Sequence, residues 1–96
     1  MRGDERYLVV IPAFNAARSV GGVIAEVKKV MDDVVVVDDG SRDGTGDVAR
    51  GAGARVLVHE HNRGKGAALK TGFKYACDNG YDGIITLDAE IGRAHV

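Results

Sequence analysis

The chain alternates between short apolar runs and stretches with helical periodicity, and this alternation constrains its fold more than any other feature. Four runs have the length and composition of buried strands: residues 7–11 (YLVVI), 34–37 (VVVV), 55–59 (RVLVH) and 83–87 (GIITL). Because these runs do not alternate apolar with polar residues, they are expected to be buried on both faces, as in a parallel sheet. The pattern predicts an α/β domain with a Rossmann-like parallel sheet and helices on both faces.

Helical periodicity fills the intervals between these runs. In the first interval, apolar residues recur at spacings of three and four, at Val20, Val23, Ile24, Val27, Val30 and Met31. A short helix is predicted over residues 45–52, where Gly53 ends it. In the last interval, the buried face of a longer helix is predicted to comprise Leu69, Phe73, Ala76 and Cys77. The order β-α-β-α-β-α-β, joined by right-handed crossovers, favours the strand order 3-2-1-4.

Length and charge limit the classes of protein to which the chain can belong. With 96 residues, it is long enough for one domain with a modest core. A formal net charge of -1 gives no reason to expect nucleic acid as a partner. The first residues contain no apolar segment long enough for a signal peptide or a membrane span, and a single cysteine fits a reducing compartment. We therefore expect a cytoplasmic chain, or the cytoplasmic part of a longer one.

Polar segments follow all of the predicted strands. They are PAFN (residues 12–15), DDGS (38–41), HEHNRGKG (59–66) and DAE (88–90). In a parallel sheet, the segments that follow the strands meet at one edge, and open α/β sheets bind ligands where the strand order reverses along that edge. With the order 3-2-1-4, this point lies between the first and fourth strands. Residues 12–15 and Asp88 are therefore expected to face each other across a ligand site.

Two of these segments carry groups suited to a nucleotide. A carboxylate of Asp38 or Asp39 could accept a hydrogen bond from a nucleobase N–H or from a ribose hydroxyl. Both residues could instead cap the turn that follows the strand. Gly64 and Gly66 allow the backbone to approach an anion at a helix start, where Lys65 adds positive charge. The alternative for this segment is a flexible loop without a ligand.

The DAE segment offers two carboxylates, Asp88 and Glu90, at the tip of the fourth strand. Oxygen ligands at this spacing could hold a hard divalent cation, Mg²⁺ or Mn²⁺, which in turn would carry the phosphates of a nucleotide. The alternative is a surface turn. His59 and His61 have a spacing that zinc ligands can have, but no third ligand lies near them in the sequence, so a zinc site is not expected.

Taken together, these segments resemble the nucleotide-binding half of a glycosyltransferase family 2 enzyme with the GT-A fold. The matching segments are VVIPAFN, VVVVDDGSRDGT, NRGKGAALKTGF and YDGIITLDA, in this order along residues 8–89. The second and third are most similar to the polyprenol-phosphate branch, which is dolichol-phosphate mannosyltransferase-like. The resemblance implies a truncated GT-A domain in which residues 7–90 bind the nucleotide sugar and the acceptor-binding half is missing.

The resemblance also implies roles for the residues of the site. The nucleotide sugar would be bound by Pro12, Ala13, Phe14, Asn15, Val37, Asp38, Asp39, Gly40, Lys65 and Asp88. Within this set, Asp39 would accept from the base and Lys65 would neutralise phosphate. Asp88 would be the catalytic first residue of the D-x-D motif and would bind Mg²⁺ or Mn²⁺ together with Glu90.

The implied reaction is the metal-dependent transfer of a sugar, with inversion, from a UDP or GDP sugar to an acceptor. Polyprenyl phosphate at the cytoplasmic face of a membrane is one candidate acceptor. Two departures from the family pattern bear on this reaction. Many relatives have Glu at the position of Ala16, and Glu90 stands where the motif has Asp. The alternative from a different class is a non-catalytic module that binds nucleotides or has a regulatory role.

Two other families with similar sheets are disfavoured by the segment after the first strand. In a receiver domain an acidic pair follows that strand, whereas PAFN follows it here. A nucleotidyltransferase usually has a Gly-rich loop with Arg or Lys at this place, and the segment PAFNAARS contains no such loop.

Residues 91–96 are expected to be a non-native tail, and the alternative is a natural short tail. The segment EIGRAHV can be encoded by GAG-ATC-GGA-AGA-GCA-CAC-GTC, and from its second base this string matches a widely used sequencing adapter. On this interpretation Glu90 replaces a native residue, and the first base of its codon is compatible with Asp. Without the elements that follow in the family, the fourth strand would be an apolar edge prone to aggregation. We therefore expect the fragment itself to be inactive.

Overall fold

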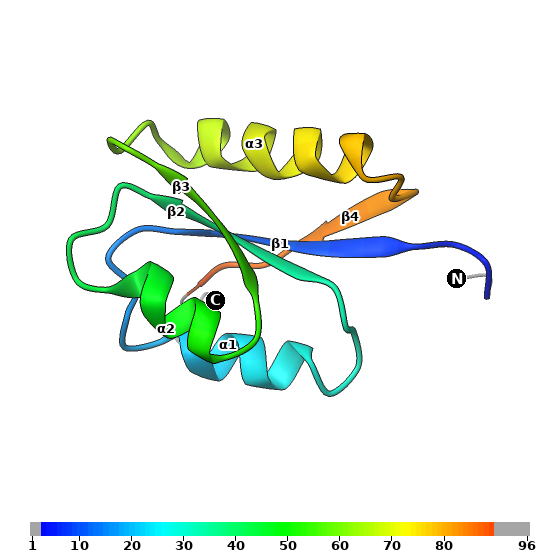
Figure 1. Cartoon of the computed structure of the whole chain (residues 1–96), viewed down its shortest axis with the longest axis horizontal. Coiled ribbons are helices and arrows are strands. Elements are labelled where there is room, and N and C mark those ends of the chain that lie inside the picture. The colour runs from blue at the N-terminus through cyan, green and yellow to red at the C-terminus, as the bar shows by residue number, and fades with distance from the viewer. Residues whose placement is uncertain (1–2, 90–96) are drawn as a thin grey trace, which may run out of the picture.

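The computed structural model describes residues 3–89, which form a parallel sheet with helices on both faces (Figure 1). The strands are β1 (Tyr7–Ala13), β2 (Val34–Asp39), β3 (Arg55–His59) and β4 (Gly83–Thr86). The helices are α1 (Val20–Val27), α2 (Thr45–Gly51) and α3 (Lys65–Asp78). All strand pairs are parallel, and the sheet has the order β3-β2-β1-β4. The predicted element order and the predicted strand order are therefore both confirmed.

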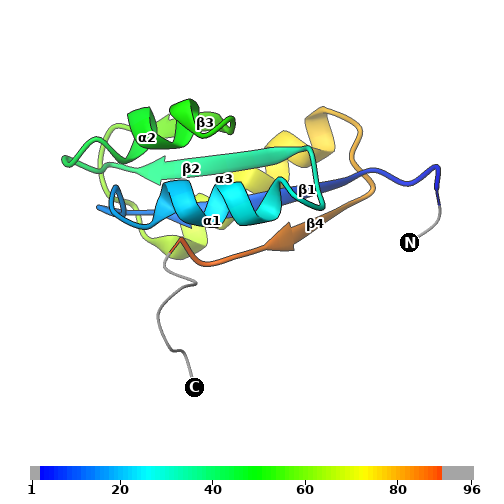
Figure 2. The ribbon, with the colours of Figure 1, turned by 90° about the horizontal axis from the view of Figure 1, so that it is seen from below.

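Helices α1 and α2 cover one face of the sheet, and α3 covers the other (Figures 1 and 2). An apolar layer of side chains lies between each face and its helices. Alternate residues of the central strands β1 and β2 enter different layers. Val9, Ile11 and Val36 belong to the layer against α1 and α2, whereas Val10 and Val35 belong to the layer against α3. Full burial of each such side chain contributes about 1.5–3 kcal/mol. The central strands are thus apolar throughout because both of their faces are covered.

The side of α3 that packs on the sheet differs from the predicted one. The buried residues of this helix are Ala68, Gly72 and Ala76. Phe73 is 56% exposed, and Cys77 is exposed as well. The small residues allow a close approach, since a Cβ atom at position 72 would lie 2.4 Å from Cγ1 of Val10. The prediction for Phe73 and Cys77 was wrong because it assigned large apolar residues to a contact that is built on the smallest ones.

The helix α1 is shorter than its apolar stripe indicated. It ends at Val27, and Val30 is 81% exposed, while Met31 is half-buried against the layer under α1. The N–H groups of Val30 and Met31 both donate to the carbonyl of Val27, at 3.0 and 2.9 Å. The chain therefore tightens into a turn after Val27, and this turn carries Val30 to the solvent. Val30 therefore does not continue the buried side of α1, although the apolar periodicity includes it.

The strands β1 and β2 both continue further than their apolar runs. In the register of the sheet, Pro12 pairs with Val37. Proline is compatible with this central strand because β4 pairs with β1 only as far as Val10, so no strand lies beside Pro12 on that side. The extension places Asp38 and Asp39 inside β2 rather than in the turn that follows it.

The strand β4 occupies one edge of the described sheet, as the sequence predicted. Beside it, Leu69 and Phe73 of α3 and Ile84 of β4 line an apolar groove. Within residues 3–89, no helix combines the length and the apolar character that crossing a membrane requires.

Candidate functional site

A pocket opens at the carboxyl end of the sheet, between β1, the start of α3 and the segment that follows β4. Its volume is about 370 Å³. The residues that line it are Pro12, Ala13, Phe14, Ala16, Asp39, Asn62, Gly64, Lys65, Ala68, Asp88 and Ala89. This is the position at which the strand order reverses, where open α/β sheets bind ligands.

The pocket brings together part of the predicted site. The predicted residues that line it are Pro12, Ala13, Phe14, Asp39, Lys65 and Asp88. Of the others, Asn15 and Gly40 lie in the loops that follow β1 and β2. Asp38 is buried at the end of β2, and Val37 has no exposed surface because it belongs to the apolar layer against α3.

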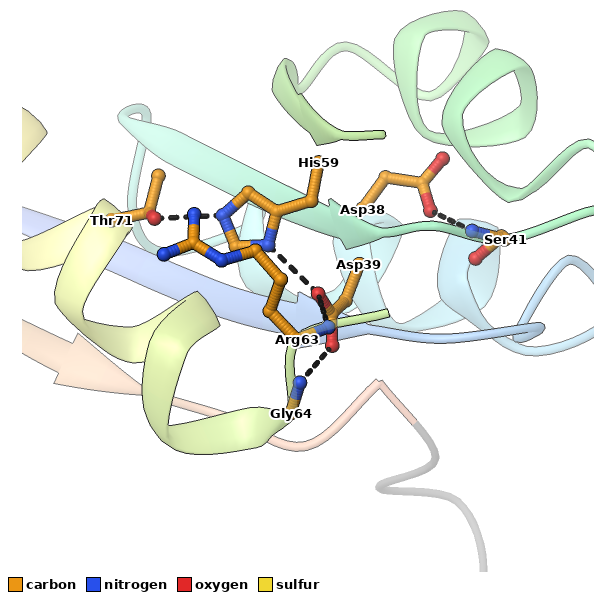
Figure 3. A network of polar contacts seen from close by, with 7 residues as sticks. All are labelled: Asp38, Asp39, Ser41, His59, Arg63, Gly64 and Thr71. Carbon is orange, nitrogen blue, oxygen red and sulfur yellow. Dashed lines mark hydrogen bonds and ion pairs between the residues drawn. The ribbon is translucent and has the colours of Figure 1, made fainter. Parts of the chain in front are cut away.

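The last residue of β2, Asp39, holds the turn that leads into α3 (Figure 3). Its Oδ1 accepts a hydrogen bond from the backbone N–H of Arg63 at 2.9 Å and lies 2.7 Å from Nδ1 of His59. Its Oδ2 accepts from the backbone N–H of Gly64 at 2.8 Å. One buried carboxylate thus ties β2 to β3 and to the turn that precedes Lys65.

The charge state of Asp39 follows from its surroundings. Burial by itself would raise the pKa of this carboxyl, because the charged form loses its hydration. The hydrogen bonds from Arg63, His59 and Gly64 outweigh burial, and the pKa of Asp39 lies below its ordinary value. Asp39 is therefore ionised at neutral pH, and an ionised carboxylate can only accept hydrogen bonds. Nδ1 of His59 consequently carries a proton and donates it to Asp39.

The ring of His59 also connects this carboxylate to α3. Its second nitrogen, Nε2, lies 2.8 Å from Oγ1 of Thr71, and in a neutral ring it accepts the hydroxyl proton. From the sequence, His59 was a candidate only for a weak zinc ligand, and Thr71 had no predicted role. The link between His59 and Asp39 becomes evident only from the register of the sheet, in which these two residues at the strand ends are partners.

The loops after β1 and β2 are fastened to each other by side chains. The N–H of Asn15 donates to Oγ of Ser41 at 2.8 Å, and its side-chain oxygen accepts from the N–H of Arg42 at 2.9 Å. The buried Oγ1 of Thr45 accepts from the N–H of Ala16 at 2.9 Å. The wall of the pocket that follows β1 is therefore fixed by contacts from the DDGSRDGT segment.

A further carboxylate, Asp43, completes this connection. Its Oδ2 accepts from the N–H of Ala17 at 3.1 Å, and its Oδ1 accepts from both the N–H and the hydroxyl of Thr45. The hydroxyl of Thr45 is the main cause that lowers the pKa of Asp43, and the backbone N–H groups act in the same direction against partial desolvation. Asp43 and Thr45 were not among the predicted site residues, because their role depends on how the two loops meet.

The residues Asp38 and Gly40 shape the turn after β2. Oδ1 of Asp38 accepts from the N–H of Ser41 at 3.0 Å, which is the capping alternative for this residue. Gly40 has a φ of 79°, and a Cβ atom there would lie 2.6 Å from the backbone nitrogen of Asn62. Only glycine therefore permits this approach of the two loops.

The charged groups on the open side of the pocket are Lys65 and Asp88. Nζ of Lys65 lies 3.9 Å from Oδ2 of Asp88, with the side chains 67% and 41% exposed. An exposed pair at this distance contributes little to stability, so it can rearrange around a ligand at small cost. Glu90, the second predicted metal ligand, lies outside the described residues. Among residues 3–89, no three His, Cys, Asp or Glu side chains are grouped so as to hold a metal ion.

A larger cavity, of about 530 Å³, lies at the opposite end of the strands. Asp33, Arg55, Tyr75 and Tyr81 are among the residues that line it. Burial raises the pKa of Tyr81, and its contact with the Asp33 carboxylate acts in the same direction. None of the predicted site residues within the described part of the chain lines this cavity.

The sequence matches a known protein family along most of its length. The matching family is described as glycosyl transferase family 2, and the match covers residues 8–90. The chain is 42% identical over 92 residues to an uncharacterized protein of Methanocaldococcus jannaschii, covering 95% of this chain and 37% of that protein. It is 34% identical over 92 residues to the undecaprenyl-phosphate mannosyltransferase of Micrococcus luteus, covering 88% of this chain and 38% of that protein.

Solved structures show the same similarity. The chain superposes on the glucosyl-3-phosphoglycerate synthase of Mycobacterium tuberculosis, in complex with Mn²⁺, UDP-glucose and phosphoglyceric acid, with a TM-score of 0.75 and 28% identity. The match covers 90% of this chain and 33% of that one. The chain thus spans a little over a third of the length of its curated relatives, at 37% and 38%.

Proposed function

The chain belongs to glycosyl transferase family 2, and on this basis we propose that residues 7–90 form the nucleotide-sugar-binding half of a glycosyltransferase. The observation that carries the proposal is the pocket at the carboxyl end of the sheet, which Asp39, Lys65 and Asp88 line together. A nucleoside diphosphate requires such groups: an acceptor for a base N–H, a cation for phosphate and a carboxylate for a metal. The similar structure that was solved with UDP-glucose and Mn²⁺ supports the same assignment.

Each part of the nucleotide has a matching part of the pocket in this proposal. Pro12 and the exposed ring of Phe14 would border the nucleobase, since an aromatic face offers a stacking surface. Asp39 would accept from the base. Lys65 begins α3 and would neutralise the diphosphate, together with the N–H groups that every helix start leaves unpaired within the helix.

The residues of the pocket are compatible with a divalent cation beside the diphosphate. Mg²⁺ is commonly bound by one or two carboxylates together with substrate phosphates, and Asp88 provides one such carboxylate. We propose Glu90 as the second ligand. When bound, Mg²⁺ or Mn²⁺ would stabilise the negative charge of the departing nucleoside diphosphate. Lys65, whose Nζ lies 3.9 Å from Asp88, would act on the same charge.

We further propose that the activity is sugar transfer with inversion at the anomeric carbon. The similar protein of Micrococcus luteus is an undecaprenyl-phosphate mannosyltransferase. This similarity supports polyprenyl phosphate, at the cytoplasmic face of a membrane, as the acceptor. Because the chain spans a little over a third of its relatives, at 37% and 38%, the proposal assigns nucleotide binding rather than turnover to these 96 residues.

Nucleotide binding by the 96-residue chain tests the proposal. UDP and GDP are titrated into the protein with and without Mg²⁺, and affinity is measured by calorimetry. Lys65→Ala is expected to weaken binding about tenfold, because it removes one charge-assisted contact. Asp88→Asn is expected to abolish the effect of Mg²⁺ on the affinity. Lys70→Ala is the matched control, because Lys70 is an exposed lysine of α3 that does not line the pocket.

Two results would contradict the proposal. One is the absence of binding by either nucleotide at millimolar concentration. The other is binding that Lys65→Ala and Lys70→Ala weaken to the same extent, since the nucleotide would then lie outside this pocket.

A further inference from the structure

The carboxylate of Asp39 has few acceptor positions left for a ligand. An ionised carboxylate offers about four positions, two on each oxygen. His59 and Arg63 occupy both positions of Oδ1, and Gly64 occupies one position of Oδ2 (Figure 3). One acceptor position, on Oδ2, therefore remains on a carboxylate that lines the pocket.

We propose that His59 determines nucleobase specificity. Its N–H occupies the position of Asp39 Oδ1 that the N–H of Arg63 leaves open, so the pocket accepts only a base that presents a single N–H to Asp39. The inference rests on the proposed function, in which Asp39 accepts from the base. Thr71 fixes the ring from the other side, with Oγ1 at 2.8 Å from Nε2. The ring is buried, so a water molecule does not easily take its place.

The nucleobases differ in the groups that they would present to Asp39. Uracil presents one imide N–H between two carbonyl oxygens, which matches a single acceptor. Guanine presents its N1–H and its N2 amino group side by side, and this pair requires both oxygens of a carboxylate. Cytosine presents an unprotonated ring nitrogen beside its amino group, and an ionised carboxylate repels that nitrogen. The geometry therefore favours a uridine nucleotide over guanosine and cytidine nucleotides.

The preference is measured first on the unmodified 96-residue chain. UDP, GDP and CDP are titrated separately in the presence of Mg²⁺, and the amide signals of Arg63 and Gly64 report on the turn that Asp39 holds. UDP is expected to bind about tenfold or more tightly than GDP, because a buried donor without an acceptor costs at least that much in affinity. CDP is expected to bind as weakly as GDP.

Two variants, whose new side chains have the same shape as each other, then test the N–H that His59 donates to Asp39. His59→Asn keeps a side-chain N–H close to the position of Nδ1, whereas His59→Leu has the same branching and no donor. The leucine variant leaves a position of Oδ1 open, so the preference for UDP over GDP is expected to fall about tenfold. The asparagine variant is expected to keep the preference. A residue with a structural role alone would weaken both nucleotides equally and leave their ratio unchanged.

The outcomes separate this inference from the proposed function. If GDP binds as tightly as UDP to the unmodified chain, or if His59→Leu leaves the ratio unchanged, the inference is overturned while the proposed function stands. If none of the three nucleotides binds, the proposed function fails and the inference fails with it. Amide spectra will show whether His59→Leu folds. If it does not, the ratio of the UDP and GDP affinities of the unmodified chain is the test of the inference.

Discussion

Replacing Asp39 by asparagine tests how one buried carboxylate holds the pocket together. Asparagine has the same shape, but it offers one oxygen and one amino group. If its oxygen takes the place of Oδ1, the N–H of Gly64 faces the amino group. If its oxygen takes the place of Oδ2, the N–H of Arg63 faces the amino group instead. In either orientation, a backbone donor of the folded protein loses its acceptor.

The magnitude follows from these contacts. The donor without an acceptor costs about 1–3 kcal/mol, and the remaining hydrogen bonds lose the strength that a charged acceptor gives them. We expect Asp39→Asn to lower the free energy of unfolding by about 2–4 kcal/mol in urea denaturation at neutral pH. This is a large part of the about 5–15 kcal/mol that is typical of a folded domain.

The control is Asp38→Asn, in the neighbouring position. Asp38 accepts one backbone hydrogen bond, from Ser41, and asparagine retains an oxygen for it. The expected loss is below about 1 kcal/mol. Equal losses in the free energy of unfolding for Asp38→Asn and Asp39→Asn would show that the contacts of Asp39 to Arg63 and Gly64 have no special stabilising role.

The dependence on pH has a defined sign. The pKa of Asp39 is lowered in the folded protein, so its stabilisation is fully present above the ordinary carboxyl value of 3.8. It is lost as the pH falls through the lower value of the folded state. The difference in stability between the unmodified protein and Asp39→Asn should therefore shrink below about pH 4. A difference that stays constant down to pH 2 would contradict this assignment.

Other substitutions probe the packing and the loops. Thr45→Val should lower the free energy of unfolding by about 1–3 kcal/mol, because the N–H of Ala16 loses its acceptor, whereas Thr45→Ser should lose less. Gly72→Ala should cost about 1–3 kcal/mol, because its Cβ would collide with β1. Gly66→Ala, on the same helix and with no atom within 4 Å, should not destabilise. Cys77 should react with a thiol reagent in the folded protein nearly as fast as in urea, and strong protection would contradict its exposure.

The strands and their order were predictable because the information is local. Each strand contains a run of mostly apolar residues, such as residues 34–37, and a turn or helix signal follows it within a few residues. The crossover rule then leaves few topologies, and the topology alone places PAFN beside Asp88. The edge at which the pocket lies could therefore be predicted before any side-chain contact was known.

The buried side of α3 could not be predicted from apolar periodicity. Ala68, Gly72 and Ala76 are weakly apolar, and they face the sheet because their size allows the helix to approach Val10 closely. Phe73 is more apolar but is 56% exposed beside the edge strand β4. A hydrophobicity scale ranks Phe above Ala and Gly as a buried residue, whereas close packing of this helix on the sheet requires the smallest side chains.

The hydrogen-bond partners of Asp39 could not be predicted from the sequence either. The contacts to Arg63 and Gly64 are made by backbone N–H groups, which carry no residue-specific signal. The contact to His59 depends on the register between β2 and β3, which pairs the two residues at the strand ends. Sequence patterns identify the candidate carboxylate, whereas its hydrogen bonds depend on the way in which two strands and a turn meet.

In the proposed function, a nucleoside diphosphate binds at the carboxyl end of the sheet. Amide signals of the labelled chain, followed during a titration with UDP and Mg²⁺, locate the bound nucleotide directly. We expect the largest changes at Phe14, Gly64, Lys65 and Asp88, which line the pocket of about 370 Å³. Changes that cluster instead around the residues of the opposite cavity, such as Arg55, would place the nucleotide outside the proposed site.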